Sequence, residues 1–243
     1  MRAGFVDYHS HVVPSGDDGA QSLAEGRRLC EEAAAHGTTI LFATPHVWPH
    51  LTLSADREAD IRSAYEELRR GATIELRLGF ELTPTRALLR DDPHRYRLDG
   101  TSAVLMEVPF LGTAHVLVAL AEHVEREELR PVIAHPERAE AVLHDPALAR
   151  GLAERGWLLQ VNSTSLLGRH GPEIAALAWE LLESRIAAIV ASDGHRETRA
   201  PVLDVACELA IARLGDDAIS FFDGSALGVT GAASASRAGA RGA

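Results

Sequence analysis

Short apolar runs rich in β-branched residues alternate along this chain with longer segments of helical periodicity, and this alternation limits the fold more than any other feature. The first helical segment is the best marked, because Ser22 and Glu25 have capping-box spacing and Gly37 follows as a stop signal. Alternation of this kind predicts βα units around a parallel sheet. The later helical segments span residues 56–70, 114–130, 146–155, 172–184 and 201–214, and the apolar runs span residues 5–7, 39–43, 74–78, 103–106, 131–134, 158–161 and 187–191.

These units follow one another without a linker, which predicts a single domain over residues 1–227. We expect an α/β fold, a distorted (β/α)7-type barrel with its active site at the carboxyl ends of the strands. A doubly wound open sheet is the alternative, and the positions of the polar residues decide between the two. From Gly228 onward almost every residue is Gly, Ala, Ser or Arg, so residues 228–243 are predicted to be a disordered tail.

Composition excludes several classes of function. All 24 cationic side chains are arginine, since the sequence contains no lysine, and this rules out Schiff-base, P-loop and carboxylated-lysine chemistry. A formal net charge of −11 disfavours binding to nucleic acid or anionic lipid. With only Cys30 and Cys207, and no apolar run long enough to span a bilayer, the sequence predicts a cytoplasmic protein without membrane insertion.

Side chains that can bind metal ions follow almost every predicted strand. The carboxyl ends of barrel strands converge on one mouth, so these side chains are expected to meet although they are distant in sequence. Neutral imidazoles together with several carboxylates suit Zn, Mn or Fe, and the set exceeds one coordination sphere, which predicts a cluster of two or three ions. The set comprises His9, His11, His46, Glu81, Glu107, His135, Asp193 and His195.

Purely structural explanations exist for single members of this set, since Asp193 has the type of a helix cap and a Glu after a strand is often the first solvated residue. It is their joint occurrence at six strand ends that favours a metal site. The spacing of Cys207 and Arg213 matches that of cysteine phosphatases, but the segment between them has no glycine and continues a helix, so Cys207 is predicted to be a core residue. Solvated surface positions are predicted for His36, His50, His94, His115, His123, His144 and His170.

Four short motifs, in a fixed order, resemble those of the polymerase-and-histidinol-phosphatase (PHP) superfamily. They are Asp-Tyr-His-Ser-His at 7–11 with Asp-Asp-Gly at 17–19, Ala-Thr-Pro-His at 43–46, Ile-Ala-His-Pro-Glu-Arg at 133–138 and Ala-Ser-Asp-Gly-His at 191–195. Over about residues 5–214 the chain more closely resembles the bacterial manganese-dependent protein-tyrosine phosphatases that act in capsular and exopolysaccharide regulation.

This resemblance implies a distorted barrel that holds three divalent metal ions, with manganese expected and zinc or iron as alternatives. It implies nine metal ligands, namely the eight residues above and Asp18, and it makes Arg138 and Arg199 the phosphate-binding arginines. The implied activity is metal-dependent hydrolysis of a phosphotyrosine protein substrate, the tail of a bacterial tyrosine kinase of polysaccharide synthesis. A phosphatase of histidinol phosphate or a nucleotide is the alternative within the superfamily, and a metal-dependent amidohydrolase is the alternative outside it.

The sequence departs from the family pattern in three places. Ser10 stands where a cysteine is common, and residues 161–164 read Val-Asn-Ser-Thr in place of a more usual Ile-Asn-Ala-Gly. The segment 46–51 differs from the family's usual loop, which leaves the substrate open while the ligands are kept. Four arginines around Tyr96, at positions 86, 90, 95 and 97, are either a docking surface for an acidic tail or an ordinary solvated loop. The sequence does not indicate an oligomeric state.

Overall fold

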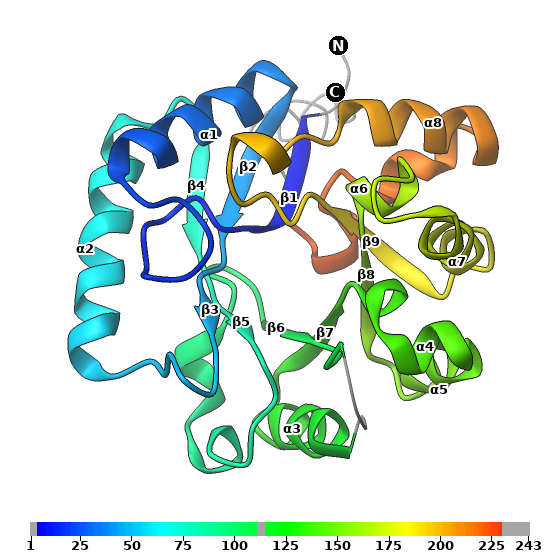
Figure 1. The fold of residues 1–243 in the computed structure, drawn as a ribbon, viewed down its shortest axis with the longest axis horizontal. Helices are drawn as coiled ribbons and strands as arrows, with labels where there is room; N and C mark the ends of the chain where they lie inside the picture. The colour runs from blue at the N-terminus through cyan, green and yellow to red at the C-terminus, as the bar shows by residue number, and fades with distance from the viewer. Residues whose placement is uncertain (1–3, 111–114, 230–243) are drawn as a thin grey trace, which may run out of the picture.

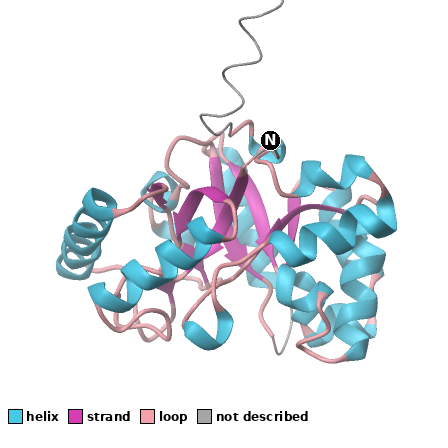
Figure 2. Cartoon of the chain, turned by 90° about the horizontal axis from the view of Figure 1, so that it is seen from above, coloured by secondary structure: helices cyan, strands magenta, loops and turns pink. Residues whose placement is uncertain are grey.

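The computed structural model describes residues 4–110 and 115–229, in which helices surround a group of strands (Figures 1 and 2). The strands are β1 (Phe5–Ser10), β2 (Thr38–Ala43), β3 (His46–Val47), β4 (Glu75–Leu78), β5 (Glu81–Leu82), β6 (Ala103–Glu107), β7 (Arg130–Ala134), β8 (Leu158–Asn162) and β9 (Ala187–Ala191). The α-helices are α1 (Leu23–Ala35), α2 (Ala55–Gly71), α3 (His115–Arg126), α4 (Glu140–His144), α5 (Ala147–Glu154), α6 (Ser163–Leu166), α7 (Pro172–Glu183) and α8 (Asp204–Leu214).

All neighbouring strands are parallel and form two sheets, one of order β1-β2-β4 and one of order β3-β5-β6-β7-β8-β9. The sheets are continuous with each other on one side, because β3 extends β2 beyond Pro45 and β5 extends β4 beyond Gly79. On the other side β1 meets β9, where the Asp193 amide donates to the His9 carbonyl (2.9 Å) and the His11 amide donates to the Gly194 carbonyl (2.6 Å). The strands therefore occupy the seven predicted positions around a distorted barrel.

Alternate residues of the strands divide between two cores. The larger core joins strand residues such as Leu41, Val104 and Val190 to the apolar faces of the surrounding helices. The smaller core is built from strand and loop residues, among them Tyr8, Phe42 and further alternate positions of the strands, so it fills the interior of the barrel. Strands buried on both faces are expected of a parallel sheet covered by helices, and this arrangement confirms the barrel over the open sheet.

Helix ends differ modestly from the predicted ones. Ser22 caps α1 by accepting from the Glu25 amide, as the capping box predicts. The segment predicted as helix up to residue 130 stops at Arg126, because Glu128 takes a left-handed conformation (φ 59°) and Arg130 already begins β7. Short helices α4 and α6 are too brief to show a clear period in the sequence.

The described chain continues past the expected domain boundary to Val229, which is buried at 4% exposure in the inner core. Residues 230–243 lie outside the described part, so the disordered tail stays a prediction. In residues 4–110 and 115–229 no helix combines the length and the apolar character that crossing a bilayer requires.

Candidate metal centre

The eight metal-type side chains predicted from the strand ends come together at one end of the barrel. Each of them is buried, with exposed fractions from 0% to 7%. His9, His46, Glu81 and Glu107 belong to strands β1, β3, β5 and β6, while His135 directly follows β7. Residues that are spread over most of the chain thus share one small volume, as the convergence of barrel strands predicts.

A β-bulge in β1 turns the His-x-His pair toward this volume. The four residues of β1 from Asp7 to Ser10 lie opposite only three of β2, from Leu41 to Ala43, so β1 carries one extra residue. Because side chains alternate along a strand, one extra residue changes which positions face inward. Tyr8 therefore faces the inner core, and the next residue, His9, is also buried, with its Nε2 3.1 Å from the Nε2 of His11.

Two ligand-type residues stand in left-handed backbone conformations. His135 has φ 34° and Asp193 has φ 51°, which is uncommon for residues other than glycine and is found where the surrounding structure holds a site in place. Gly194 follows Asp193 with no room for a side chain, since a Cβ there would lie 2.6 Å from the Cα of Pro201. These turns direct the side chains after β7 and β9 toward the same volume as those of β1, β3, β5 and β6.

The candidate ligands form three overlapping groups, each with ligand atoms within 4.8 Å of one another. Glu81 belongs to two groups and is central, because its carboxylate lies 2.9 Å from His46 Nδ1, 2.9 Å from His135 Nε2 and 3.1 Å from His9 Nε2. His11 also belongs to two. The groups are His11 with His46 and His195, then His9 with His11, Glu81 and Asp193, then Glu81 with Glu107 and His135.

The donor atoms are suited to bind cations, whereas they serve one another poorly as hydrogen-bond partners. The buried Oε2 of Glu81 and Oδ1 of Asp193 have no hydrogen-bond donor among the described residues. A buried carboxylate oxygen without a donor costs free energy, and a metal ion at this place would remove that cost. The facing Nε2 atoms of His9 and His11 likewise suit two lone pairs directed at one ion. The residues present therefore fit a centre of several divalent ions.

The pKa shifts of the buried groups also indicate a cation site. Burial by itself would raise the pKa of Glu81, but the neighbouring imidazoles of His9 and His46 hold it well below its usual range. Burial would likewise lower the pKa of His11, but the carboxylates of Asp17, Asp193 and Glu81 raise it well above its usual range. Burial raises the pKa of Glu107, and the nearby charge of Glu81 adds to this rise. The buried carboxylates thus require positive charge close by.

A chain of side-chain amides from β8 holds two candidate ligands, His9 and Asp193, in place. His9 donates from Nδ1 to Gln160 Oε1 (2.9 Å), Gln160 donates to Asn162 Oδ1 (2.8 Å), and Asn162 donates to Asp193 Oδ2 (2.8 Å). This chain fixes the proton of His9 on Nδ1 and leaves Nε2 free for a metal ion. Gln160 and Asn162 were not predicted as site residues, although Asn162 belongs to the 161–164 segment that departs from the family pattern.

Asp17 and Asp18 have different places. Asp17 is 7% exposed, accepts from the amides of Gly19 and His46, and lies 3.8 Å from His11 Nδ1, so it supports two ligands. The Asp18 side chain is 60% exposed at the rim, with Oδ1 3.2 Å from His195 Nε2 and 3.5 Å from His46 Nε2. Asp18, expected to be the ninth ligand, is therefore at the edge of the centre, outside the three buried groups. Sequence reasoning named Asp17 only as part of a motif.

The two arginines expected to bind phosphate meet at Asp193. Arg138 donates from Nη1 to Asp193 Oδ2 (2.9 Å), and Nη1 of Arg199 lies 3.7 Å from the same oxygen. Arg199 also contacts the Nδ1 of His195. Both guanidinium groups line a cavity of about 360 Å³ that is also lined by Asp18, His46, Glu107, His135, Asp193 and His195, together with Trp48, Pro49, His50, Thr83 and Phe110.

Comparison with known proteins agrees with this geometry. The family model for capsular polysaccharide synthesis, CpsB/CapC, matches residues 5–222. The chain belongs to the CpsB/CapC family. Tyrosine-protein phosphatase YwqE of Bacillus subtilis is 29% identical over 197 residues, which cover 78% of this chain and 77% of YwqE. Tyrosine-protein phosphatase CpsB of Streptococcus pneumoniae is 23% identical over 230 residues, covering 86% of this chain and 91% of that protein.

A solved structure supports the same assignment for this CpsB/CapC chain. A crystal structure from the work on YwqE of Bacillus subtilis and CpsB of Streptococcus pneumoniae, described as unique metal-dependent tyrosine phosphatases, matches with a TM-score of 0.79 and 27% identity, covering 88% of this chain and 89% of that one. A mutant organophosphorus hydrolase of Deinococcus radiodurans matches with a TM-score of 0.55 and 12% identity, over 90% of this chain and 89% of that one. The second likeness concerns the fold alone.

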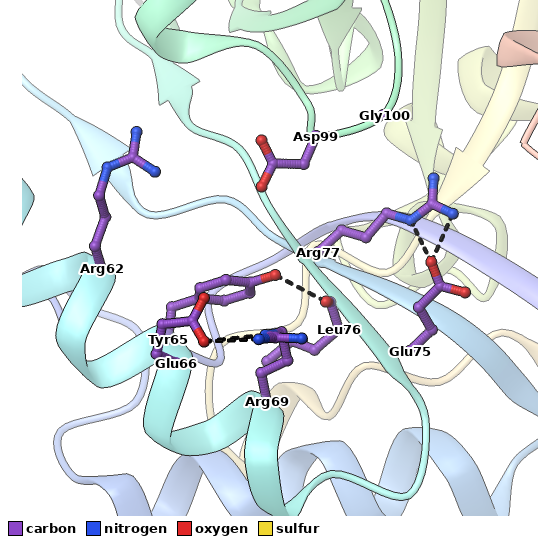
Figure 3. Close-up of a pocket in the computed structure, with 9 residues that line it drawn as sticks. All are labelled: Arg62, Tyr65, Glu66, Arg69, Glu75, Leu76, Arg77, Asp99 and Gly100. Carbon is purple, nitrogen blue, oxygen red and sulfur yellow. Dashed lines mark hydrogen bonds and ion pairs between the residues drawn. The ribbon is translucent and has the colours of Figure 1, made fainter.

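A second cavity of this CpsB/CapC chain, of about 510 Å³, lies between α2 and β4 (Figure 3). Tyr65 and Asp99 line it, and the Tyr65 hydroxyl donates to the Leu76 carbonyl (3.0 Å). The charges of its arginines are already compensated, so we assign no function to this cavity. The ion pairs are Arg62 with Glu58 at 2.9 Å, Arg69 with Glu66 at 2.8 Å and Arg77 with Glu75 at 2.6 Å.

The structure also places three residues whose roles the sequence left open or assigned to the surface or the core, Arg95, His50 and Cys207. Arg95, offered as part of a docking surface, donates to Glu58 (2.7 Å) and lies over the ring of Tyr96 at 5.7 Å, so it stabilises its own loop. His50, predicted to be an ordinary surface residue, is exposed but lines the cavity of the metal centre. Cys207 is buried at 3% exposure on α8, as predicted for a core residue.

Proposed function

We propose that this chain is a metal-dependent protein-tyrosine phosphatase. The observation that carries the proposal is the meeting of three groups of metal-type ligands with Arg138 and Arg199 in one cavity. Three groups of imidazole and carboxylate donors suit divalent ions, and two guanidinium groups suit the oxygens of a phosphate. Relatives that carry the name tyrosine-protein phosphatase, and the metal-dependent solved neighbour, support the assignment of the reaction.

The centre is proposed to hold three divalent ions, with manganese as the resident metal and zinc or iron as alternatives. Each of the three groups would hold one ion, and Glu81 and His11 are each shared by two groups. Asp18 would complete the site at the rim, where its carboxylate faces His46 and His195. Carboxylates between cations reduce the repulsion that closely spaced ions would otherwise have.

Arg138 and Arg199 are proposed to bind the oxygens of the phosphoryl group. Charge-assisted bonds of this kind contribute most where charge accumulates in the transition state. Asp193 keeps both guanidinium groups oriented, since its Oδ2 accepts from Arg138 and lies close to Arg199. The bound ions supply an activated water as nucleophile and neutralise phosphate charge. A phenolic leaving group, with a pKa of about 10, needs little protonation.

The proposed substrate is a phosphotyrosine in the tail of a bacterial tyrosine kinase of polysaccharide synthesis. The family's link to capsular polysaccharide synthesis supports this choice of pathway. Such a substrate places the enzyme in the cytoplasm, where the buried thiols of Cys30 and Cys207 stay reduced.

The test is a metal-reconstitution assay. The purified protein is stripped with chelator, loaded in turn with Mn, Zn or Fe, and assayed on p-nitrophenyl phosphate, a phosphotyrosine peptide and histidinol phosphate. We expect metal-dependent turnover of the phosphotyrosine peptide, its loss in His9→Ala, and unchanged turnover in Cys207→Ser, which serves as the matched control.

Other outcomes would redirect the assignment. A strong preference for histidinol phosphate would keep the metal centre and remove the protein substrate. The absence of turnover of every phosphoester with all three metals would refute the proposed reaction and leave amide hydrolysis as the next activity to assay.

A further inference from the structure

Two aromatic side chains stand beside the candidate ligands, and nothing in the phosphate chemistry accounts for them. The ring of Trp48 stacks on the imidazole of His46, with centroids 4.4 Å apart and planes 26° apart. The ring of Phe110 stacks on the imidazole of His135, with centroids 5.5 Å apart and planes 6° apart. Both rings line the cavity that contains Arg138.

The two rings stand at opposite ends of the row of ligand groups. His46 belongs to the group with His11 and His195, whereas His135 belongs to the group with Glu107, and Glu81 joins the row between them. The order of the strands gives the same separation of the two rings. Trp48 follows β3, Phe110 follows β6, and β5 lies between these two strands in the sheet. A phosphate bound over this row of ligand groups would therefore have an aromatic side chain on each side of the path by which it leaves the cavity.

Hydrogen bonds hold the backbone around Trp48 in place. Trp48 and Leu51 exchange both backbone hydrogen bonds, at 3.2 and 3.1 Å, which closes a tight turn at Pro49 and His50. Arg57 fastens this turn by donating to the carbonyls of Leu51 (3.0 Å) and His46 (2.9 Å). His50 stacks on the ring of Trp48 at 5.2 Å and extends the aromatic surface outward.

Phe110, at the other end of the row of ligand groups, presents apolar surface to solvent. Its side chain is 41% exposed, although the guanidinium carbon of Arg138 lies 5.0 Å from its ring. The amide of Glu140 donates to the Phe110 carbonyl (3.1 Å), which anchors the backbone at this position. A large exposed aromatic residue at the mouth of a polar cavity is suited to contact an apolar part of a ligand.

We propose that Trp48 and Phe110 form the walls of a slot that receives the aromatic ring of an aryl phosphate. This inference rests on the proposed function and adds to it the residues that select an aryl leaving group over an alkyl one. Flat aromatic rings gain attraction from neighbouring rings that a short alkyl chain does not gain. Each wall should contribute about 3- to 10-fold to the preference for aryl over alkyl phosphates.

The experiment compares one ratio across variants of the manganese-loaded enzyme. The ratio is kcat/KM for a phosphotyrosine peptide divided by kcat/KM for the same peptide with phosphoserine, so that the intrinsic reactivity of each ester cancels between variants. We expect Trp48→Leu and Phe110→Leu each to lower the ratio about 3- to 10-fold through a higher KM for phosphotyrosine, and Trp48→Phe to restore most of it. Leu148→Ala, an equally exposed apolar position on α5 (41%), is the control and should leave the ratio unchanged.

Inhibition by inorganic phosphate distinguishes a slot that binds the aromatic ring from a purely structural role of Trp48 and Phe110. Phosphate has no ring, so its inhibition constant and the bound manganese content should stay the same in Phe110→Leu. A kcat/KM ratio that stays within about twofold of the wild-type value in the variants would overturn the proposal. A parallel loss of phosphate binding and of bound manganese would also overturn it, because the two rings would then act only by supporting His46 and His135.

Binding without turnover distinguishes the failure of this inference from the failure of the proposed function. Calorimetry with phenylphosphonate and propylphosphonate, which are not hydrolysed, measures the same aryl preference even if the enzyme cleaves no phosphotyrosine. A wild-type preference for phenylphosphonate that Phe110→Leu removes would support the slot, and equal affinities of the wild type for both phosphonates would refute it.

Discussion

Replacing Gln160 by methionine tests the amide chain behind the metal centre. Gln160 is fully buried, accepts from His9 Nδ1 (2.9 Å) and donates to Asn162 Oδ1 (2.8 Å). Methionine has nearly the same length but forms neither bond, so one donor and one acceptor lose their partners inside the protein. At about 1–3 kcal/mol for each buried group left without a partner, the free energy of unfolding of the stripped protein should fall by about 2–6 kcal/mol.

Metal affinity should fall as well, because His9 would no longer be held with its proton on Nδ1 and Nε2 facing the site. Loss of such a supporting hydrogen bond weakens metal binding about 10- to 100-fold. The assay is titration of chelator-stripped protein with Mn²⁺ by calorimetry, with bound metal counted by elemental analysis and folding checked by circular dichroism.

Gln160→Glu is the matched variant. A carboxylate at this position still accepts from His9 Nδ1 and adds negative charge near the cations, although it cannot donate to Asn162. We expect it to keep manganese affinity within about threefold of the wild type while losing part of the stability. If folded Gln160→Met binds manganese as tightly as the wild type, the role assigned to the amide chain is wrong.

Three further predictions concern the arginines, the surface and the cysteines. Arg138→Ala should lower kcat about 100-fold with manganese still bound, as steady-state kinetics and metal analysis would show; an unchanged kcat would remove Arg138 from phosphate binding. His36 accepts a proton more readily than usual because Asp204 (2.7 Å) raises its pKa, so this partly exposed pair stabilises the fold below pH 6.5 and loses its effect as pH rises through the raised value. Asp204→Asn should therefore lower Tm at pH 5.5 and leave it nearly unchanged at pH 9.5, and an equal loss at both pH values would contradict this. Cys207→Ser should keep the metal-dependent turnover of p-nitrophenyl phosphate, and its loss would reopen a cysteine mechanism.

Much of the ligand set was predictable from local sequence. A βα repeat makes the carboxyl end of each strand recognisable, and a histidine or acid directly after an apolar run can be read without knowing any neighbour in space. For this reason His46, Glu81, Glu107 and His135 are in the buried centre where the sequence placed them. The same local signals located α1 and its cap at Ser22.

Contacts between strands could not be predicted in this way. The bulge in β1 depends on pairing with β2, the amide chain needs Gln160 to lie beside His9 across the barrel, and the rim position of Asp18 depends on where its loop crosses His195. Each is set by register and barrel geometry, which bring together residues of different strands.

The sequence by itself determined the order of strands and helices, the types of donor at the strand ends and the exclusion of lysine chemistry. Tertiary structure decided which candidate donors lie within reach of one another, which groups orient them, and that Trp48 and Phe110 stand at the two ends of the row of candidate ligands. The physical reason is that periodicity and capping act over a few neighbouring residues, whereas a metal centre depends on distances between residues more than a hundred positions apart, such as His9 and Gln160.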